Sequence, residues 1–235
     1  MGVDTRADII LQGATLAGRT DAGVLTNAIA WLNDWLRSQY QAWPWPFLMQ
    51  RRSGLVLPAG TQTILVGGGN SGITEQVKRV EDGFYLRTAD YGHRSKPRLR
   101  AWKDGPQDYD PDMTKVSTEK GPPEWVQVRA GPSPANGVWE LLFYPVTDKQ
   151  YILNFDYQFM PAPLASGASV PLYPNDRTMK HAVAMMTLLF SNGADDSAYR
   201  SMSDTVGGMA IDDRVKSGNI PGTNDTWGLD GGVFR

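Results

Sequence analysis

The stretch at residues 25–47, LTNAIAWLNDWLRSQYQAWPWPF, decides the fold. In its first part, apolar residues recur three and four positions apart, which is the spacing of one face of an amphipathic helix: Leu25, Ala28, Ile29, Leu32, Trp35 and Leu36. Pro44 and Pro46 lack the amide hydrogen that a helix needs, and each favours an extended conformation at the residue before it. The stretch therefore predicts a helix that ends near Gln41 or Ala42 and continues as extended chain.

The composition is that of a globular protein without cysteine chemistry. The chain has 235 residues, of which 41% are hydrophobic, so it is long enough to bury a substantial core. The absence of cysteine excludes disulfides, a thiol nucleophile and cysteine-ligated metals. A formal net charge of -2 gives no global positive field for nucleic acid or an anionic membrane. No signal-peptide pattern and no bilayer-spanning apolar run are present, so we expect no membrane anchor.

Residues 5–18 carry a shorter helical pattern. Thr5 or Asp4 is the expected N-cap of this first helix, and Gly13 and Gly18 should weaken it. The apolar residues of the pattern are Ile9, Ile10, Leu11, Ala14 and Leu16.

From Phe47 onwards the chain changes to short segments rich in β-branched or aromatic residues, separated by Gly, Pro, Asp or Asn. These segments predict strands, at residues 54–57, 61–66, 75–80, 83–88, 98–102 and 125–129. The polar segment 103–123, which is rich in Pro, Asp and Lys, is predicted to be a long loop.

The clearest strand pattern lies at residues 138–144 and 150–159, on the two sides of a Pro-Val-Thr-Asp-Lys turn. Apolar and polar residues alternate on both sides, which predicts an antiparallel hairpin. The apolar members are Trp139, Leu141 and Phe143 before the turn, and Tyr151, Leu153, Phe155 and Tyr157 after it.

The helical period returns after a proline-rich linker at 161–174. Asp176 is the predicted N-cap of a helix whose apolar stripe ends before Asn192 and Gly193. A last helix is predicted at 195–216. The residues after Gly218 have no periodicity, so we expect them to form an extended tail.

Together these patterns predict an α+β protein. Because neither terminal helix pair can bury its apolar stripe alone, the N- and C-terminal helices should pack as one helical bundle, with an antiparallel β-rich domain inserted between them. The predicted parts are N-terminal helices at 1–44, the inserted domain at 45–165, C-terminal helices at 166–218 and the tail at 219–235.

No catalytic, cofactor or metal site is predicted, so we do not expect an enzyme. Gly67, Gly69 and Gly72 match the G-x-G-x-x-G pattern, but strands rather than a helix should follow, which favours a hairpin loop over a nucleotide site. His93 and His181 fall in different predicted elements, with no pattern that joins them in a catalytic or metal site.

Two groups of residues suggest contacts with other molecules. Basic residues occupy alternate positions and would share one face of a strand, namely Arg94, Lys96, Arg98 and Arg100. This face is interpreted either as a protein-contact surface or as a solvated sheet edge. The aromatic cluster of Trp43, Trp45 and Phe47 is interpreted as a joint between helix and sheet, with ligand stacking as the alternative.

The order of these elements resembles the head-to-tail adaptors of tailed phages, and most closely the tail tubular A type of short-tailed phages. The residues that carry the resemblance are 32–47, 139–145 with 151–157, and Pro161, Pro163, Val170, Pro171, Leu172 and Pro174. The resemblance covers most of residues 20–215.

The resemblance implies a non-enzymatic ring at the head-tail junction of the virion, made in the host cytoplasm. In this family the ring is a dodecamer that binds the portal protein and the tail nozzle protein, and DNA passes through its lumen without sequence-specific binding. On this basis the tail at 219–235 is expected to dock on the portal. Its candidate contact residues are Trp227, Leu229, Val233, Phe234 and Arg235.

Two other functions remain as alternatives. A carbohydrate-binding or tail-accessory module would use Trp43, Trp45, Trp139 and Tyr151 as exposed sugar platforms. A nucleotide-dependent enzyme would use the glycine loop.

Overall fold

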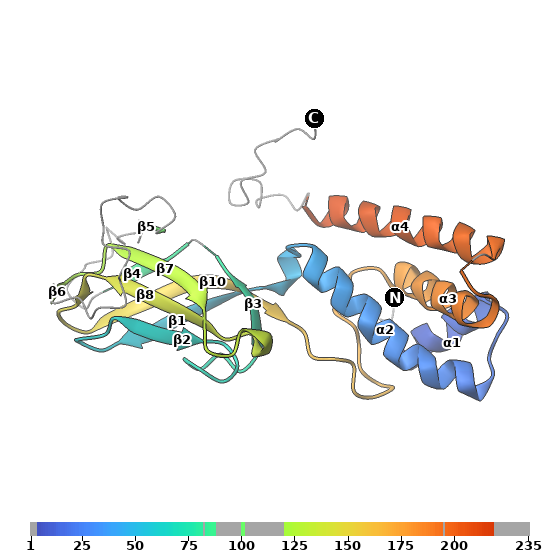
Figure 1. Ribbon diagram of the computed structural model, residues 1–235, viewed down its shortest axis with the longest axis horizontal. Helices are drawn as coiled ribbons and strands as arrows, with labels where there is room; N and C mark the ends of the chain where they lie inside the picture. The colour runs from blue at the N-terminus through green and yellow to red at the C-terminus, as the bar shows by residue number, and fades with distance from the viewer. Residues whose placement is uncertain (1–3, 82, 88–99, 102–119, 195, 219–235) are drawn as a thin grey trace. The chain divides into compact units, whose positions relative to one another are not determined.

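The computed structural model describes residues 4–81, 83–87, 100–101, 120–194 and 196–218 (Figure 1). The chain divides into two compact units, one of Met1–Phe47 with Ala162–Arg235 and the other of Leu48–Pro161. The described part of the first unit contains four α-helices, and the described part of the second contains the β-strands. We call them the helical unit and the β unit. The protein is thus of mixed α+β class.

The first helix begins after one of its two predicted N-caps, and the second ends where the sequence predicts. Helix α1 (Arg6–Leu16) begins after Thr5, whose side chain accepts a hydrogen bond from the Asp8 amide in a reciprocal capping box. Helix α2 (Ala22–Ala42) begins after Asp21 and ends at Trp43, which is extended with φ -137° and ψ 144°. The two prolines that follow Trp43 explain why α2 stops there.

One predicted cap in the C-terminal part is wrong by one residue. Helix α3 (Asp176–Asn192) is capped by Asn175, whose side chain accepts from the Arg177 amide, and Asp176 is the first helical residue. There its charge favours the positive end of the helix dipole. The predicted end at Asn192 with Gly193 as the C-cap is confirmed. The last helix, α4 (Ser197–Gly218), begins two residues later than predicted.

Helix α3 lies at the centre of the helical unit and contacts α1, α2 and α4. The crossing with α1 is very close at Gly13, where an added Cβ would lie 2.6 Å from the Cβ of Val183 and 2.7 Å from the Lys180 carbonyl oxygen. The glycine that should weaken α1 as a helix is therefore the residue that lets α1 approach α3.

The linker after the β unit holds the N-terminal half of the helical unit. The Asn33 side chain accepts from the Leu164 amide at 2.8 Å, and the Arg6 guanidinium donates to the Leu164 carbonyl at 2.6 Å. The first amides of α1 donate to the carbonyls of Gly167 and Ser169. These contacts join residues more than 130 positions apart in sequence.

The described strands of the β unit form two four-stranded sheets and a two-stranded one. One sheet contains β1 (Met49–Leu57), β10 (Tyr151–Met160) and β3 (Gln76–Val80), with β4 (Tyr85–Arg87) also paired to β10. The second has the order β2 (Thr63–Val66), β8 (Trp139–Tyr144), β7 (Trp125–Ala130) and β5 (Arg100–Ala101). The third pairs β6 (Lys120–Gly121) with β9 (Val146–Thr147).

The predicted hairpin is wrong in its pairing. Both segments are strands, but β8 pairs with β2 and β7, whereas β10 pairs with β1, β3 and β4. The segment read as a tight turn contains β9, which pairs in parallel with β6 inside the predicted long loop. The β5–β7 pair is also parallel, so the inserted domain is not purely antiparallel.

One apolar core joins the two four-stranded sheets. Alternate residues of β8 and β10 are buried in it, which explains why both segments show the same alternation without being partners. The core contains Leu55, Leu57, Val66, Ile73, Val77, Val80, Phe84, Leu86, Val126, Leu141, Phe143, Tyr151, Leu153, Phe155 and Tyr157.

Candidate functional site

The aromatic segment after α2 packs inside the helical unit. Trp45 is fully buried, and its indole Nε1 donates to the Gln39 carbonyl at 2.8 Å. Its ring lies 5.3 Å from that of Tyr173 in an edge-to-face arrangement and 5.4 Å from Phe47. Trp43 is only half-buried. Because the Trp45 ring is enclosed, it anchors the end of α2 and is not accessible to a ligand.

A buried carboxylate on α4 is the centre of a polar cluster in the described part of the helical unit. Asp213 is 5% exposed and accepts three hydrogen bonds, from Tyr173 Oη at 3.1 Å, Asn175 Nδ2 at 2.7 Å and Thr178 Oγ1 at 2.7 Å. We call these four residues the Asp213 cluster. Its donors come from the linker, the cap of α3 and the first turn of α3, so it ties α4 to the start of α3.

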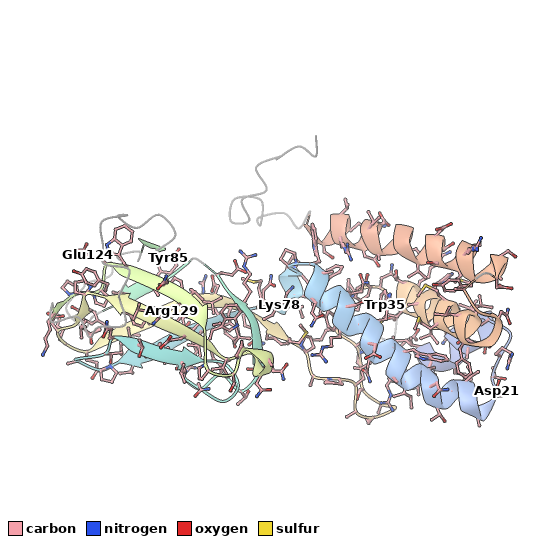
Figure 2. The ribbon with its side chains drawn as sticks, in the orientation of Figure 1. Asp21, Trp35, Lys78, Tyr85, Glu124 and Arg129 are labelled. Carbon is pink, nitrogen blue, oxygen red and sulfur yellow. The ribbon has the colours of Figure 1, made fainter. Side chains whose placement is uncertain are left out.

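The protonation of the cluster follows from its burial. Burial raises the pKa of the Tyr173 phenol, and the charge of Asp213 and the hydrogen bond to it raise that pKa further. Tyr173 therefore stays neutral and remains a donor through the physiological range. The Tyr173 ring also packs edge-to-face on Trp35, which Figure 2 labels on α2. Enclosed in this way, the cluster connects three elements and offers no open catalytic group.

Large apolar side chains remain exposed on the described helices. On α4, Ile211 and Val215 lie one turn apart and are 61% and 56% exposed. Gly208 precedes Ile211, and an added Cβ there would have no atom within 4 Å. The other helices also expose apolar side chains, which are Leu11 and Leu16 on α1 and Phe190 on α3. An open apolar stripe of this kind on a helix is typical of a protein-contact surface.

The glycine loop has the geometry of two turns. Gly68 and Gly69 have positive φ, and the Asn70 amide donates to the Gly67 carbonyl. Ser71 and Gly72 also have positive φ, and the Ile73 amide donates to the Asn70 carbonyl in the same way. This is the pattern of two successive type I′ turns.

Four amides of this loop, those of Gly68, Gly69, Asn70 and Ile73, already donate to backbone carbonyls. Those of Gly68 and Gly69 donate to the carbonyls of Glu75 and Ile73, and a strand, β3, follows the loop. A phosphate-binding loop has free backbone amides and is followed by a helix. This loop is followed by a strand and uses amides internally, so its geometry does not favour nucleotide binding.

The residues named as sugar platforms do not form an exposed surface. Tyr151 is 1% exposed, and its hydroxyl donates to Asp148 at 2.6 Å. Trp139 is half-buried, and its Nε1 donates to the Val77 carbonyl at 2.8 Å. With Trp45 also buried, the rings needed for stacking on a sugar are mostly inside the two units.

The predicted docking tail lies outside the described residues, and of the predicted basic strand only Arg100 is described. Arg94, Lys96 and Arg98 lie outside them, and so does the whole predicted docking tail with Trp227, Leu229, Val233, Phe234 and Arg235. Arg100 begins β5, and its backbone pairs opposite Trp125.

The described residues contain no group of three or more His, Asp or Glu side chains that could hold a metal ion. His181 is on α3, where its ring Nδ1 lies 2.8 Å from the Arg177 carbonyl oxygen of its own helix. None of the described helices is long and apolar enough to cross a membrane.

Sequence reasoning missed the Asp213 cluster. One signal was present, because Asp213 continues the spacing of Val206 and Ala210, both of which are buried on α4. An acidic residue in an apolar stripe indicates a buried partner. Its donors, however, lie 35 to 40 residues earlier, and nothing local identifies them.

Comparison of the chain with known protein families finds no matching family, and comparison with curated proteins finds no match either.

Proposed function

We propose that the chain is a structural head-to-tail adaptor of a tailed phage virion, and not an enzyme. In this proposal the subunits form a ring, with twelve copies implied by the resemblance, that joins the portal protein to the tail nozzle protein. DNA passes through the ring without sequence-specific binding. The protein would be made in the host cytoplasm and end at the head-tail junction of the virion.

The observation that supports this proposal best is the interruption of one unit by the other. Both chain ends belong to the helical unit, and Leu48–Pro161 form a separate β unit between them. This is the arrangement that the resemblance implies. We propose further that the four helices work as one bundle, that the β unit contacts the nozzle or a neighbouring subunit, and that residues 219–235 dock on the portal.

The exposed side chains of the helical unit suggest where subunits could meet. Ile211 and Val215 on α4 form an exposed apolar stripe. Exposure of such a stripe to water is unfavourable in a free subunit, and it is typical of a surface that contacts another protein. Burial of this stripe against a neighbour would stabilise a ring, in proportion to the apolar area removed from water.

The test is assembly with a portal protein encoded in the same genome, followed by mass photometry and negative-stain microscopy. We expect rings with the full chain, and loss of portal attachment when residues 219–235 are deleted. The pair of changes Ile211→Glu and Val215→Glu should prevent ring formation, whereas Asp204→Lys on the same helix is the matched surface control. A chain that stays monomeric with and without portal contradicts the proposal, and unchanged attachment after the deletion contradicts the role of the tail.

A further inference from the structure

The edge strand β2 of one four-stranded sheet carries no charge in its sequence, Thr63-Ile64-Leu65-Val66. At the edge of the other large sheet, β1 contains Arg51 and Arg52 and is interrupted by a bulge after Arg52. Edge charges and bulges prevent unwanted strand pairing. The edge of β2 has neither protection.

The register shows which backbone groups of β2 point away from the sheet. The Phe143 amide donates to the Gln62 carbonyl at 2.7 Å, and these two residues lie directly opposite in the register that pairs Thr63 with Leu142. In an antiparallel pair, bonded and non-bonded positions alternate. The N–H and C=O groups of Thr63 and Leu65 therefore point outward, away from β8.

Of these outward groups, one is already used. The Ser71 hydroxyl donates to the Leu65 carbonyl. Within the described residues, the Thr63 N–H, the Thr63 C=O and the Leu65 N–H have no such partner. Two donors and one acceptor at this spacing match the backbone of an extended peptide.

A shallow hollow lies beside the same residues. The side chains of Thr63 and Leu65 are on the outer face of the sheet, because Ile64 and Val66 pack on the core. The hollow, of about 520 Å³, extends from residues 63–65 across Glu140 to Ala130, Gly131 and Pro132.

The hollow carries one charged residue. The Glu140 side chain is 28% exposed and paired with Arg129 at 3.2 Å; Figure 2 labels Arg129 on β7. Arg129 neutralises part of this charge, and the exposed part of the carboxylate can still pair with a basic side chain of a bound segment.

We propose that β2 is a strand-addition site, which binds an extended segment of another protein rich in β-branched residues, with Lys or Arg facing the hollow. The occupant is a polypeptide because backbone groups define the contact, and its charge is set by Glu140. The proposal does not depend on the function proposed above and concerns only the β unit.

The first experiment uses the full chain and a soluble, Lys-tagged fluorescent peptide, Thr-Val-Arg-Val-Thr-Val, in a polarisation titration. Two further versions carry N-methyl groups on alternate residues, either on the Val amides or on the Thr and Arg amides. Only one of these two sets can face β2. We expect one methylated peptide to bind like the parent and the other to bind roughly tenfold more weakly or not at all. Equal binding of both, or no binding of the parent peptide at millimolar concentration, overturns the proposal.

The second experiment changes the protein. Thr63→Pro removes an outward N–H and leaves the hydrogen bonds to β8 in place, because Pro is tolerated where the N–H of an edge strand faces solvent. It should weaken the parent peptide roughly tenfold, while the control Thr63→Val, which keeps the amide, should bind like the natural chain. Unchanged binding by Thr63→Pro overturns the proposal. If the natural chain forms an oligomer and Thr63→Pro converts it to a monomer, the proposal is also overturned. The segment that pairs with β2 would then belong to a second copy of the chain.

Discussion

The helical unit and the β unit are stabilised in different ways. In the β unit, the buried residues of two four-stranded sheets form one continuous apolar core, so stability is distributed over many similar contacts. In the helical unit, apolar side chains of the helices are also buried, and three specific contacts join residues far apart in sequence: the close crossing at Gly13, the packing of Trp45 on Tyr173 and the Asp213 cluster. We therefore expect single substitutions at these three contacts to destabilise the helical unit.

The largest expected effect is that of Trp45→Ala. The change removes a fully buried indole and its hydrogen bond to Gln39, so the helical unit should lose about 3–5 kcal/mol of unfolding free energy. Urea unfolding followed by circular dichroism at 222 nm reports this unit, because the described helices all lie in it. Trp43→Ala, at a half-buried position nearby, is the control and should cost clearly less. A neutral effect of Trp45→Ala would mean that the ring is not enclosed in solution.

Asp213→Ala should be next in size. It leaves the donors of Tyr173, Asn175 and Thr178 without their acceptor, which should cost about 2–4 kcal/mol. Asp212→Ala is a close control, because Asp212 is exposed and forms a surface ion pair with Lys216 one turn later; it should change stability by less than about 0.5 kcal/mol. Equal effects of the two changes would contradict the cluster's role in holding α4.

Gly13→Ala should cost about 1–3 kcal/mol, although alanine favours a helix more than glycine does. The added methyl group would overlap Val183 and the Lys180 carbonyl, and backbone cannot yield as a flexible side chain can. The matched change Gly208→Ala meets no atom within 4 Å and should stabilise α4 by about 0.5–1 kcal/mol. Opposite signs in thermal unfolding would confirm the close crossing; stabilisation by both would contradict it.

The same difference decides how much the sequence could predict. The limits of α1 and α2 follow from local signals, which are the Thr5 capping box and the prolines after Trp43. The strands of the β unit also carry local signals, but their partners do not. The alternation at Phe143 and Phe155 shows that each side chain is buried in a core, and two facing sheets satisfy that pattern as well as a hairpin does.

The candidate sites also differ in whether neighbouring residues in the sequence indicate them. The role of Trp45 as part of a joint rests on prolines next to it in sequence, whereas the Asp213 cluster assembles across 35 to 40 residues. The open edge of β2 could not be read from its sequence, because the outward direction of Thr63 is set by its register with Leu142. Long-range register is a tertiary property, and no local pattern encodes it.

The smallest expected effect is a loss of stability of the helical unit in alkali. Burial raises the pKa of both Tyr173 and Tyr40, whereas an unfolded tyrosine ionises near its ordinary pKa of about 10. Because the unfolded chain releases these protons first, the stabilisation is fully present below pH 10 and decreases as the pH rises above it, by about 1 kcal/mol per pH unit for each group.

Tyr173→Phe tests this dependence. At pH 8 the variant should be less stable by about 1–2 kcal/mol, because it lacks the hydrogen bond to Asp213. Above pH 10 the difference in stability between the natural chain and the variant should shrink, because the variant lacks one of the two phenols whose ionisation favours the unfolded chain. Tyr40→Phe should reduce the pH dependence of stability by a similar amount. Urea unfolding at pH 8, 10 and 11 measures both slopes. If the curves of the natural chain and Tyr173→Phe stay parallel over this range, Tyr173 is not held neutral by burial, and the Asp213 cluster must be open to water.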